Sequence, residues 1–218
     1  MVPAVVEQSP GVWVVQHPGA QHELGILRSA ATQRAEFRAA AERLGLYLAI
    51  AATARLATER IEVETPLCRT HAYRRTEPLV FVPILRAGML LLPSFIRLFP
   101  EARIGYIGLR RDEETLTPEL YYANLPPLEP GAQVFVLDPM LATGGSLEAA
   151  VEYLQRHGAR SLTAVCILAA PEGVERLRRR CPELPIVTAA VDQGLTANGF
   201  IIPGLGDAGD RAHGTGAA

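Results

Sequence analysis

The sequence predicts an α/β protein built on a doubly wound parallel sheet that is flanked by helices. Four short runs rich in Val, Ile and Leu lie at 79–85, 133–137, 161–168 and 185–188, and their continuous apolar character is typical of strands buried on both faces. Segments with helical spacing separate these runs, so strands and helices alternate. No linker, charge block or internal repeat marks a boundary, and we therefore expect residues 1–218 to form a single domain.

The elements before the first of these runs are less regular. Residues 12–15 form a short apolar run that predicts an edge strand, and His17-Pro18-Gly19 is a turn signal. From about residue 20 to residue 60, leucines at helical spacing amid Ala and Arg predict one or two amphipathic helices. Helical spacing recurs further along the chain at 89–99, 145–157 and 172–180.

The composition excludes several classes of protein. A formal net charge of -2 gives no basic field that would draw the chain onto nucleic acid. The three cysteines lie far apart, which favours reduced thiols in the cytoplasm over a disulfide framework or a metal site. No signal peptide is recognisable, and Pro93, Arg97 and Pro100 interrupt the best candidate for a membrane span. We expect a cytoplasmic protein with neither nucleic acid nor membrane as a partner.

The sequence DPMLATGGS, which begins at Asp138, joins a predicted strand to a predicted helix. Gly144 and Gly145 allow the backbone to turn tightly and to point N–H groups at an anion, while Thr143 and Ser146 add hydroxyl donors and the helix N-terminus adds partial positive charge. Asp138 cannot bind a phosphate, but its carboxylate can accept hydrogen bonds from the vicinal hydroxyls of a ribose. The predicted ligand is therefore a sugar that carries a phosphate.

This segment matches no motif for ATP or dinucleotides. No Lys stands beside Ser146, as a Walker A loop requires, and the G-x-G-x-x-G spacing is absent. A bare T-G-G-S would more often be an ordinary turn between a strand and a helix, but the full segment is more specific. It resembles the motif that binds 5-phosphoribosyl 1-diphosphate (PRPP) in type I phosphoribosyltransferases, in the form found in uracil phosphoribosyltransferases, where a proline replaces a second acid. The PRPP-site residues that this resemblance implies are Asp138, Pro139, Met140, Leu141, Ala142, Thr143, Gly144, Gly145 and Ser146.

A second segment, VPILRAGM at 82–89, resembles the loop of the same family that binds the diphosphate. The resemblance implies that Arg86 contacts the diphosphate and that the peptide bond between Leu85 and Arg86 is cis. Without the other motifs, Arg86 is equally consistent with a surface charge that follows a strand.

A third segment, at 107–118, resembles the flexible arm that folds over PRPP in the family. Its charged, proline-containing composition is typical of an exposed hairpin or lid, and a lid has a physical reason, because water would otherwise hydrolyse the activated sugar. The resemblance implies a diphosphate contact for Arg111, whereas Arg110 is the weaker candidate.

The C-terminal segment at 199–211, GFIIPGLGDAGDR, resembles the hood that binds uracil, which we place at about 192–214. Uracil presents an acceptor, a donor and an acceptor along one edge, so backbone groups can bind it without a charged side chain. The amine of cytosine would leave buried groups unpaired. The uracil-binding residues that the resemblance implies are Ile201, Gly206, Asp207 and Ala208.

The resemblance extends from residue 14 to residue 214 and implies a complete reaction. Uracil and PRPP give UMP and diphosphate, a step of UMP salvage, with Mg²⁺ bound mainly through PRPP and not in a protein metal site. Asp207, which also matches a PRPP-site residue, is expected to arrange the Mg²⁺ or its waters. A homodimer or larger homo-oligomer is expected, and activation by GTP is left open. The catalytic residues implied are Arg86, Arg111, Asp138 and Asp207.

The chain departs from the family pattern at two places. Phe200 stands where the family usually has Tyr, which bears on the base pocket, and Ile50-Ala51 stands where it often has Tyr-Glu, which bears on a subunit contact or an effector response. Two other functions stay open: transfer to a different base, and a pyrimidine-sensing regulator that binds RNA, against which the overall acidity argues.

Two smaller features complete the expectations. The arginine-rich helix at 175–180 is expected to present a solvated face, and Asp210 and Arg211 are expected to form a structural pair.

Overall fold

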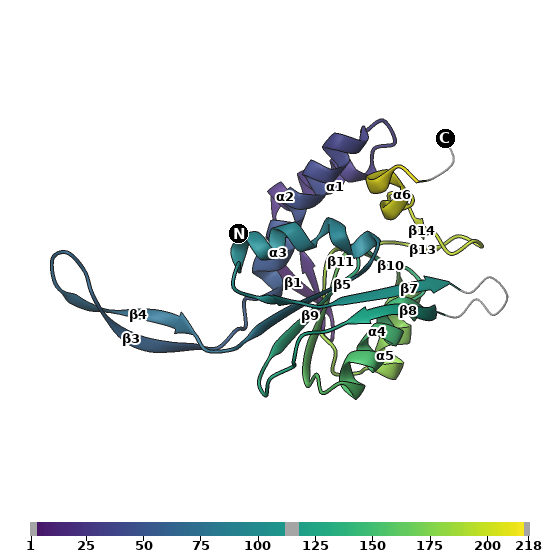
Figure 1. The fold of residues 1–218 in the computed structure, drawn as a ribbon. Helices are drawn as coiled ribbons and strands as arrows, with labels where there is room; N and C mark the ends of the chain where they lie inside the picture. The colour runs from purple at the N-terminus through teal and green to yellow at the C-terminus, as the bar shows by residue number, and fades with distance from the viewer. Residues whose placement is uncertain (1–3, 112–117, 216–218) are drawn as a thin grey trace.

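The computed structural model describes residues 4–111 and 118–215, except for the side chain of Arg111. A twisted sheet forms the centre of the molecule, with helices on both of its faces (Figure 1). Its central strands pair in parallel in the order β12-β11-β9-β5. The runs predicted to be buried strands are confirmed as β5 (Leu79–Leu85), β9 (Gln133–Leu137), β11 (Ser161–Ala169) and β12 (Ile186–Val191).

Helices cover both faces of this sheet, which explains why its central strands are apolar throughout. Along β5, Phe81 packs against Phe135 on one face, whereas Val80 and Val82 belong to the core on the other face. The first face carries α1 (Pro18–Arg28), α2 (Arg34–Ala52), the 3-10 turn η1 (Ala87–Leu90) and α3 (Leu92–Leu98), and the second carries α4 (Gly145–Arg156) and α5 (Pro171–Arg180).

The short run at residues 12–15 is a strand, β2 (Val12–Val15), but it is not at the edge. It pairs in parallel with β12 and in antiparallel fashion with β1 (Val5–Ser9), which the sequence did not reveal. Val12, Val14 and Val15 are buried, so this strand needs a neighbour on each side, and the largely exposed β1 supplies the edge.

The helical prediction for residues 20–60 is confirmed as two helices, although the second ends earlier than expected. His17 caps α1, because its Nδ1 accepts a hydrogen bond from the N–H of Gly19 at 3.0 Å, and Pro18 occupies the first turn. Helix α2 ends at Ala52, and the chain then forms β3 (Thr58–Glu64). The sequence TERIEVE alternates charged and branched residues with a period of two, which favours a strand.

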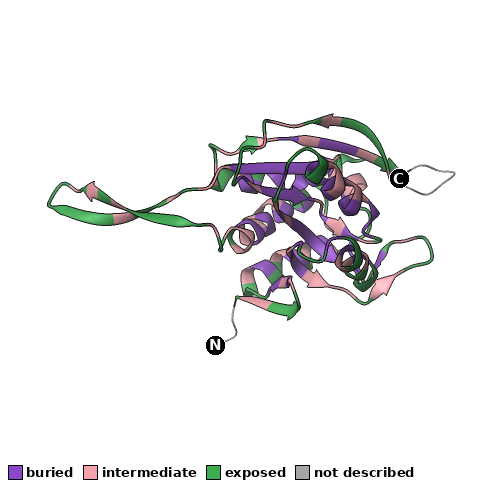
Figure 2. Ribbon diagram, turned by 90° about the horizontal axis from the view of Figure 1, so that it is seen from below, coloured by how far each residue is buried: buried purple, intermediate pink, exposed green. Residues whose placement is uncertain are grey.

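Strand β3 and its partner β4 (Arg69–Arg75) form a separate two-stranded sheet that projects from the body (Figure 1). Most of this hairpin is exposed (Figure 2), and the side chains of Leu67 and Tyr73 are 94% and 76% exposed. The sequence analysis did not predict this hairpin, because the helical interpretation of residues 20–60 extended over the start of β3, and because β4 (RTHAYRR) has no apolar alternation.

The hairpin predicted near residues 107–118 is confirmed for its two strands, β7 (Tyr106–Arg111) and β8 (Pro118–Asn124), which pair in antiparallel fashion. Residues 112–117, between them, lie outside the described residues. The remaining elements are short: β6 (Arg103–Ile104), β10 (Met140–Leu141), β13 (Gly194–Leu195), β14 (Ile201–Ile202) and α6 (Ala208–His213). Within the described parts of the chain, each helix is too short or too polar to traverse a lipid bilayer.

Candidate active site

The segment predicted to bind phosphate lies at the carboxyl end of the central strand β9. Helix α4 begins directly after it, with Gly144 at the N-cap position in a left-handed conformation (φ +80°) that disfavours other residues. Among the residues that the structure describes, no side chain caps this helix, so the N–H groups of its first turn are available to a ligand at the loop. A cavity of about 90 Å³ is enclosed here by Asp138, Met140, Leu141, Ala142, Thr143, Gly144, Gly145, Ser146 and Leu147.

Backbone hydrogen bonds fix this loop against the neighbouring strand β11. The carbonyl oxygen of Pro139 accepts from the N–H groups of Ile167 and Leu168 at 2.9 and 3.0 Å. The carbonyl oxygen of Leu141 accepts from Ala170 at 2.8 Å. The loop is therefore held by the sheet before any ligand arrives.

Helix α5 supports the loop from behind, through an acidic residue that the sequence analysis did not single out. Glu148 on α4 is buried, and its carboxylate pairs with Arg176 and, at 3.1 Å, with Arg180. Gly173 packs directly on Gly144. The predicted solvated arginine face therefore has a second role, because two of its exposed arginines also neutralise a buried carboxylate next to the loop.

Asp138 lies at the end of β9, partly covered by the loop. Desolvation raises the pKa of its carboxyl group to about 7, although a hydrogen bond from the backbone of Met140, at 3.4 Å, acts in the opposite direction. The carboxylate form is the one that can accept hydrogen bonds from a diol. Its availability therefore changes near neutral pH.

The two predicted diphosphate arginines follow β5 and end β7. The Leu85–Arg86 peptide bond is cis, as the family resemblance predicts. Arg86 is exposed, and its side chain makes no hydrogen bond or ion pair with any other described residue, so the guanidinium is available to a ligand. The side chain of Arg111 lies outside the described residues. Its neighbour Arg110 pairs with Glu119 across the hairpin at 2.8 Å, so Arg110 is less available to a ligand.

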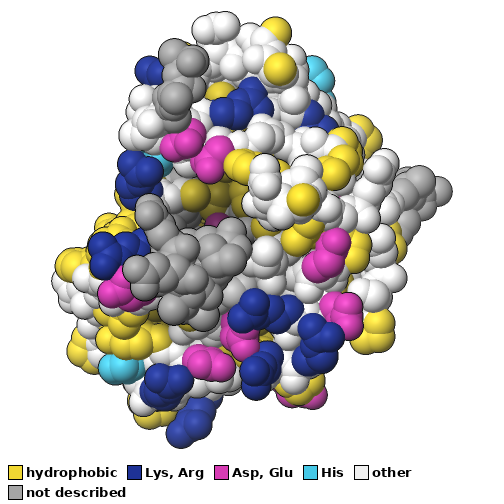
Figure 3. Space-filling model, turned by 90° about the vertical axis from the view of Figure 1, so that its right-hand side faces the viewer, with side chains coloured by type: hydrophobic (Ala, Val, Ile, Leu, Met, Phe, Trp, Pro, Cys, Tyr) yellow, Lys and Arg dark blue, Asp and Glu magenta, His cyan; other side chains and the backbone are white. Residues whose placement is uncertain are grey.

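The hood, residues 192–214, forms a second cavity of about 200 Å³ beside the first. Met140 and Ala142 line both cavities, so a ligand in one borders a ligand in the other. Figure 3 looks onto this end of the molecule, where hydrophobic and acidic side chains surround a hollow. The residues that line the second cavity are Ala87, Met140, Ala142, Gly199, Phe200, Ile201, Gly206, Asp207, Ala208 and Gly209.

All four residues predicted to bind uracil line this second cavity, and one of them also caps a helix. The Oδ1 atom of Asp207 accepts from the N–H of Asp210 at 2.8 Å and so begins α6. Asp210 and Arg211 do not pair with each other, which corrects that expectation. Arg211 instead donates to the carbonyl oxygens of Leu27, Leu205 and Ser29, because these three backbone acceptors converge on its guanidinium where the hood meets the end of α1.

A larger cavity of about 420 Å³ lies at the opposite, amino-terminal ends of the strands, beside Trp13, Arg55, Gln133 and Ser161. None of the residues predicted to bind substrate lines it. The rule that ligands bind at the carboxyl ends of parallel strands favours the two smaller cavities over this larger one.

A mostly parallel sheet with a ribose-phosphate loop after a central strand, a cis-peptide loop after its neighbour and a C-terminal hood defines the class of type I phosphoribosyltransferases. The adenine phosphoribosyltransferase of Trypanosoma brucei, solved in complex with AMP, pyrophosphate and ribose-5-phosphate, shares this fold with a TM-score of 0.60, at 13% identity over 89% of each chain. The family model for uracil phosphoribosyltransferase matches residues 14–215, and the chain belongs to that family.

Two relatives illustrate how much of the chain this likeness covers. The uracil phosphoribosyltransferase of Salinibacter ruber is 46% identical over 204 residues, which are 94% of this chain and 97% of that protein. The structure of the AQ2163 protein from Aquifex aeolicus superposes with a TM-score of 0.89 at 36% identity, covering 95% of this chain and 100% of the other. The fold and the family that the sequence motifs predicted are both confirmed.

Proposed function

We propose that the protein joins uracil to the ribose of PRPP, releasing diphosphate and forming UMP, and that it thereby salvages uracil. One observation carries the proposal: a cavity beneath a helix N-terminus and a cavity lined by hood backbone share Met140 and Ala142 as a common border. A sugar phosphate in the first cavity would present its C1′ atom to a base in the second. That juxtaposition is what transfer to a base requires.

The loop at residues 138–146 binds the ribose 5′-phosphate. Backbone N–H groups at Gly144, Gly145 and Ser146 and the hydroxyl of Thr143 donate to its oxygens, and the dipole of α4 adds partial positive charge. Asp138, in its ionised form, accepts from the two ribose hydroxyls. These contacts hold the sugar still while the bond at C1′ changes.

Arg86 and Arg111 neutralise the diphosphate as it leaves. Bidentate donation to phosphate oxygens stabilises the charge that builds up on the leaving group, so the bond between C1′ and oxygen breaks more easily. We infer that Mg²⁺ arrives with PRPP, because the diphosphate of PRPP supplies the hard oxygen ligands that this cation prefers. Asp207, exposed at the rim of the base cavity, has the carboxylate needed to hold one of its waters. Mg²⁺ would add further neutralisation of the diphosphate.

Uracil is held by the main chain of the hood, at Ile201, Gly206 and Ala208. Two N–H groups and one carbonyl suit its acceptor, donor and acceptor edge, whereas cytosine would set a donor against a donor. As positive charge develops at C1′, uracil N1 forms the new bond, diphosphate departs with the electron pair, and N1 loses its proton.

The test is an assay of the purified protein with Mg²⁺ and PRPP in which uracil, cytosine, hypoxanthine and orotate are offered separately. We expect UMP from uracil, with cytosine slower by about 10⁴-fold or more. Hypoxanthine or orotate as the preferred base would keep the fold but overturn the substrate. No nucleotide from any base would overturn the activity.

We also infer a homo-oligomer, at least a dimer, that works in the cytoplasm. An isolated two-stranded hairpin is marginally stable in water, so the exposed β3–β4 hairpin with Leu67 and Tyr73 favours a second subunit as its support. The unpaired thiols of Cys68, Cys166 and Cys181 favour a reducing compartment. Sedimentation analysis measures the oligomeric state, and parallel runs with GTP detect an effector response.

A further inference from the structure

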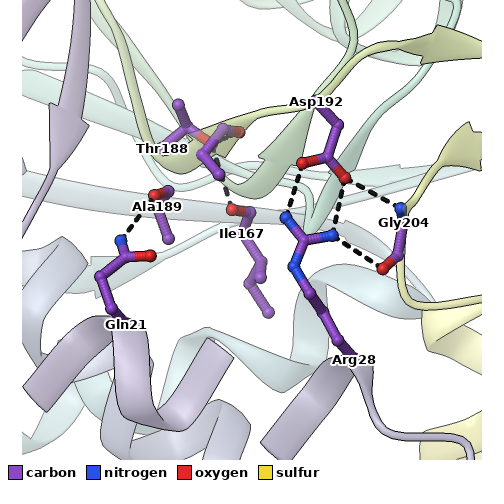
Figure 4. Close-up of polar contacts among 8 residues, drawn as sticks. Gln21, Arg28, Ile167, Thr188, Ala189, Asp192 and Gly204 are labelled. Carbon is purple, nitrogen blue, oxygen red and sulfur yellow. Dashed lines mark hydrogen bonds and ion pairs between the residues drawn. The ribbon is translucent and has the colours of Figure 1, made fainter. Parts of the chain in front are cut away.

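A bidentate ion pair joins the helical layer to the hood behind the base cavity. Arg28 is the last residue of α1, and Asp192 directly follows β12. The Nη2 and Nη1 atoms of Arg28 donate to the Oδ1 and Oδ2 atoms of Asp192 at 2.5 and 2.8 Å (Figure 4). The Asp192 side chain is only 5% exposed, so the pair is shielded from solvent on the acidic side.

The same pair holds both backbone groups of Gly204. The N–H of Gly204 donates to Oδ2 of Asp192 at 2.9 Å, and its carbonyl oxygen accepts from Nη1 of Arg28 at 2.8 Å, which closes the ring of contacts in Figure 4. Gly204 has a φ of +62°, and a Cβ atom here would overlap the carbonyl oxygen of Ile201. Asp192 therefore fixes the peptide group before Gly204, and Arg28 fixes the peptide group after it.

The backbone on both sides of Gly204 lines the base cavity. Ile201 lies three residues before it and Gly206 two residues after it, and both line that cavity. Neither Arg28 nor Asp192 lines it, and neither makes a hydrogen bond to the segment 138–146. The two side chains therefore act on the base site through the hood backbone at Gly204.

We propose that Arg28 and Asp192 are positioning residues for uracil, which fix the course of the hood backbone at Gly204 and thereby determine affinity and selectivity for the base but not for PRPP. The inference rests on the proposed function. Recognition by the backbone requires the chain to be held in place. Unlike a side chain, a backbone N–H or carbonyl group cannot change rotamer to restore its hydrogen bond when the chain shifts. A shift of about 1 Å at a recognition site costs on the order of 100-fold in rate.

The experiment compares steady-state kinetics of the wild type with Arg28→Lys, Arg28→Ala and Asp192→Asn. Lysine keeps the charge but offers a single nitrogen, which cannot serve both Asp192 and the Gly204 carbonyl. We expect the KM for uracil to rise about 10-fold or more in each variant, the KM for PRPP to change by less than about 2-fold, and the preference for uracil over cytosine to fall. Arg43→Ala is the matched control, because Arg43 joins α2 to α1, the helix that carries Arg28, through Glu23 at 2.9 Å, and its ion pairs are with Glu23 and Glu36 and not with the hood.

Each outcome supports or overturns the proposal. A wild type that forms no UMP contradicts the proposed function itself. A wild type that forms UMP while folded Arg28→Lys keeps its uracil KM and its base preference contradicts the positioning role alone, and so does an equal rise in both KM values. If Arg28→Ala does not fold, the comparison rests on Arg28→Lys and Asp192→Asn, which keep polar partners in place.

Discussion

The phosphate cavity is lined almost entirely by consecutive residues from Asp138 to Leu147, whereas the base cavity draws its lining from three separate parts of the chain. The first is fixed mainly by local backbone geometry and the adjoining strand β11. The second is held by ties that span the chain, such as the contacts of Arg28 with Asp192, 164 residues away, and with Gly204, 176 residues away. The difference teaches that the phosphate half of the site is specified locally and the base half by tertiary contacts. Substitutions in one half should therefore change the KM for PRPP, and substitutions in the other half the KM for uracil.

Arg86 directly precedes Ala87, which lines the base cavity, and its loss should have the largest effect. Arg86→Ala removes a donor to the leaving diphosphate, and we expect kcat/KM to fall roughly 100- to 1,000-fold with the thermal unfolding temperature unchanged. Steady-state kinetics and calorimetry check both. A normal rate would remove Arg86 from the mechanism.

Gly144 tests whether the phosphate half is local. Gly144→Ala introduces a Cβ at a φ of +80° and within 3.0 Å of the Gly173 carbonyl oxygen, so we expect the KM for PRPP to rise about 10-fold or more and the KM for uracil to stay constant.

Gly131→Ala is the matched control for this prediction. Gly131 also has a positive φ, +83°, but a Cβ atom there would meet no atom within 4 Å. Both alanine variants should lose about 1–3 kcal/mol of folding free energy, but Gly131→Ala should keep normal kinetic constants. Equal effects of the two variants on PRPP would contradict a special role for the loop.

Asp138 makes the phosphate half of the site sensitive to pH, which gives a further test of that half. Its pKa is raised to about 7, so in the free enzyme kcat/KM for PRPP should fall about tenfold per pH unit as the pH drops below 7 and the carboxylate becomes protonated. Asp138→Asn should abolish this inflection and leave only the titration of the substrate phosphates near pH 6. A pH profile of the two proteins, measured from pH 5 to 9, distinguishes them.

Asp138 affects folding stability and activity in opposite directions as the pH changes. Because its folded pKa lies above the ordinary value of 3.8, this group favours the folded state at pH values below 3.8, and that contribution is lost as the pH rises through 7. At pH 8 the Asn variant should therefore unfold at a higher temperature than the wild type. An unchanged unfolding temperature would show that the carboxyl group is better solvated than its surroundings suggest.

Glu148 should give the smallest effect. Glu148→Gln weakens the contact with Arg176 and Arg180 behind the phosphate loop, and we expect a loss of about 1–2 kcal/mol in folding free energy and a rise of roughly 2- to 5-fold in the KM for PRPP. Glu175→Gln, which breaks an exposed pair with Arg179, should change neither quantity. Indistinguishable variants would mean that α5 does not support the loop.

The sequence predicted those parts of the molecule whose signals are local. The central strands are continuous apolar runs, and the phosphate loop is one contiguous motif between a strand and a helix. One placement and one boundary were wrong for physical reasons: β2 is not at the edge of the sheet, because β1 pairs with its outer side, and α2 ends before a segment with a period of two. The β3–β4 hairpin was missed because it buries little against the rest of the chain.

The supports of the site could not be predicted in the same way. Arg28, Glu148 and Asp192 act on residues far away in the sequence, and no pattern in a single sequence joins such positions. One signal was available for Asp192, which follows the end of a central strand, where ligand-site residues of parallel sheets gather. Glu148 offered none, because an acidic residue in the first turn of a helix is common for helix stability alone.

Small residues, among them Gly199, Gly206, Ala208 and Gly209, make up much of the base cavity, so its walls are largely main chain. Main-chain atoms are the same in every amino acid, and their placement survives most replacements of side chains. A lineage that drifts in sequence would thus inherit its choice of nucleobase almost unaltered. To acquire a new one, it would have to move the main chain itself, by inserting or deleting residues in this loop or by replacing one of the few residues that hold it, such as Arg28 and Asp192.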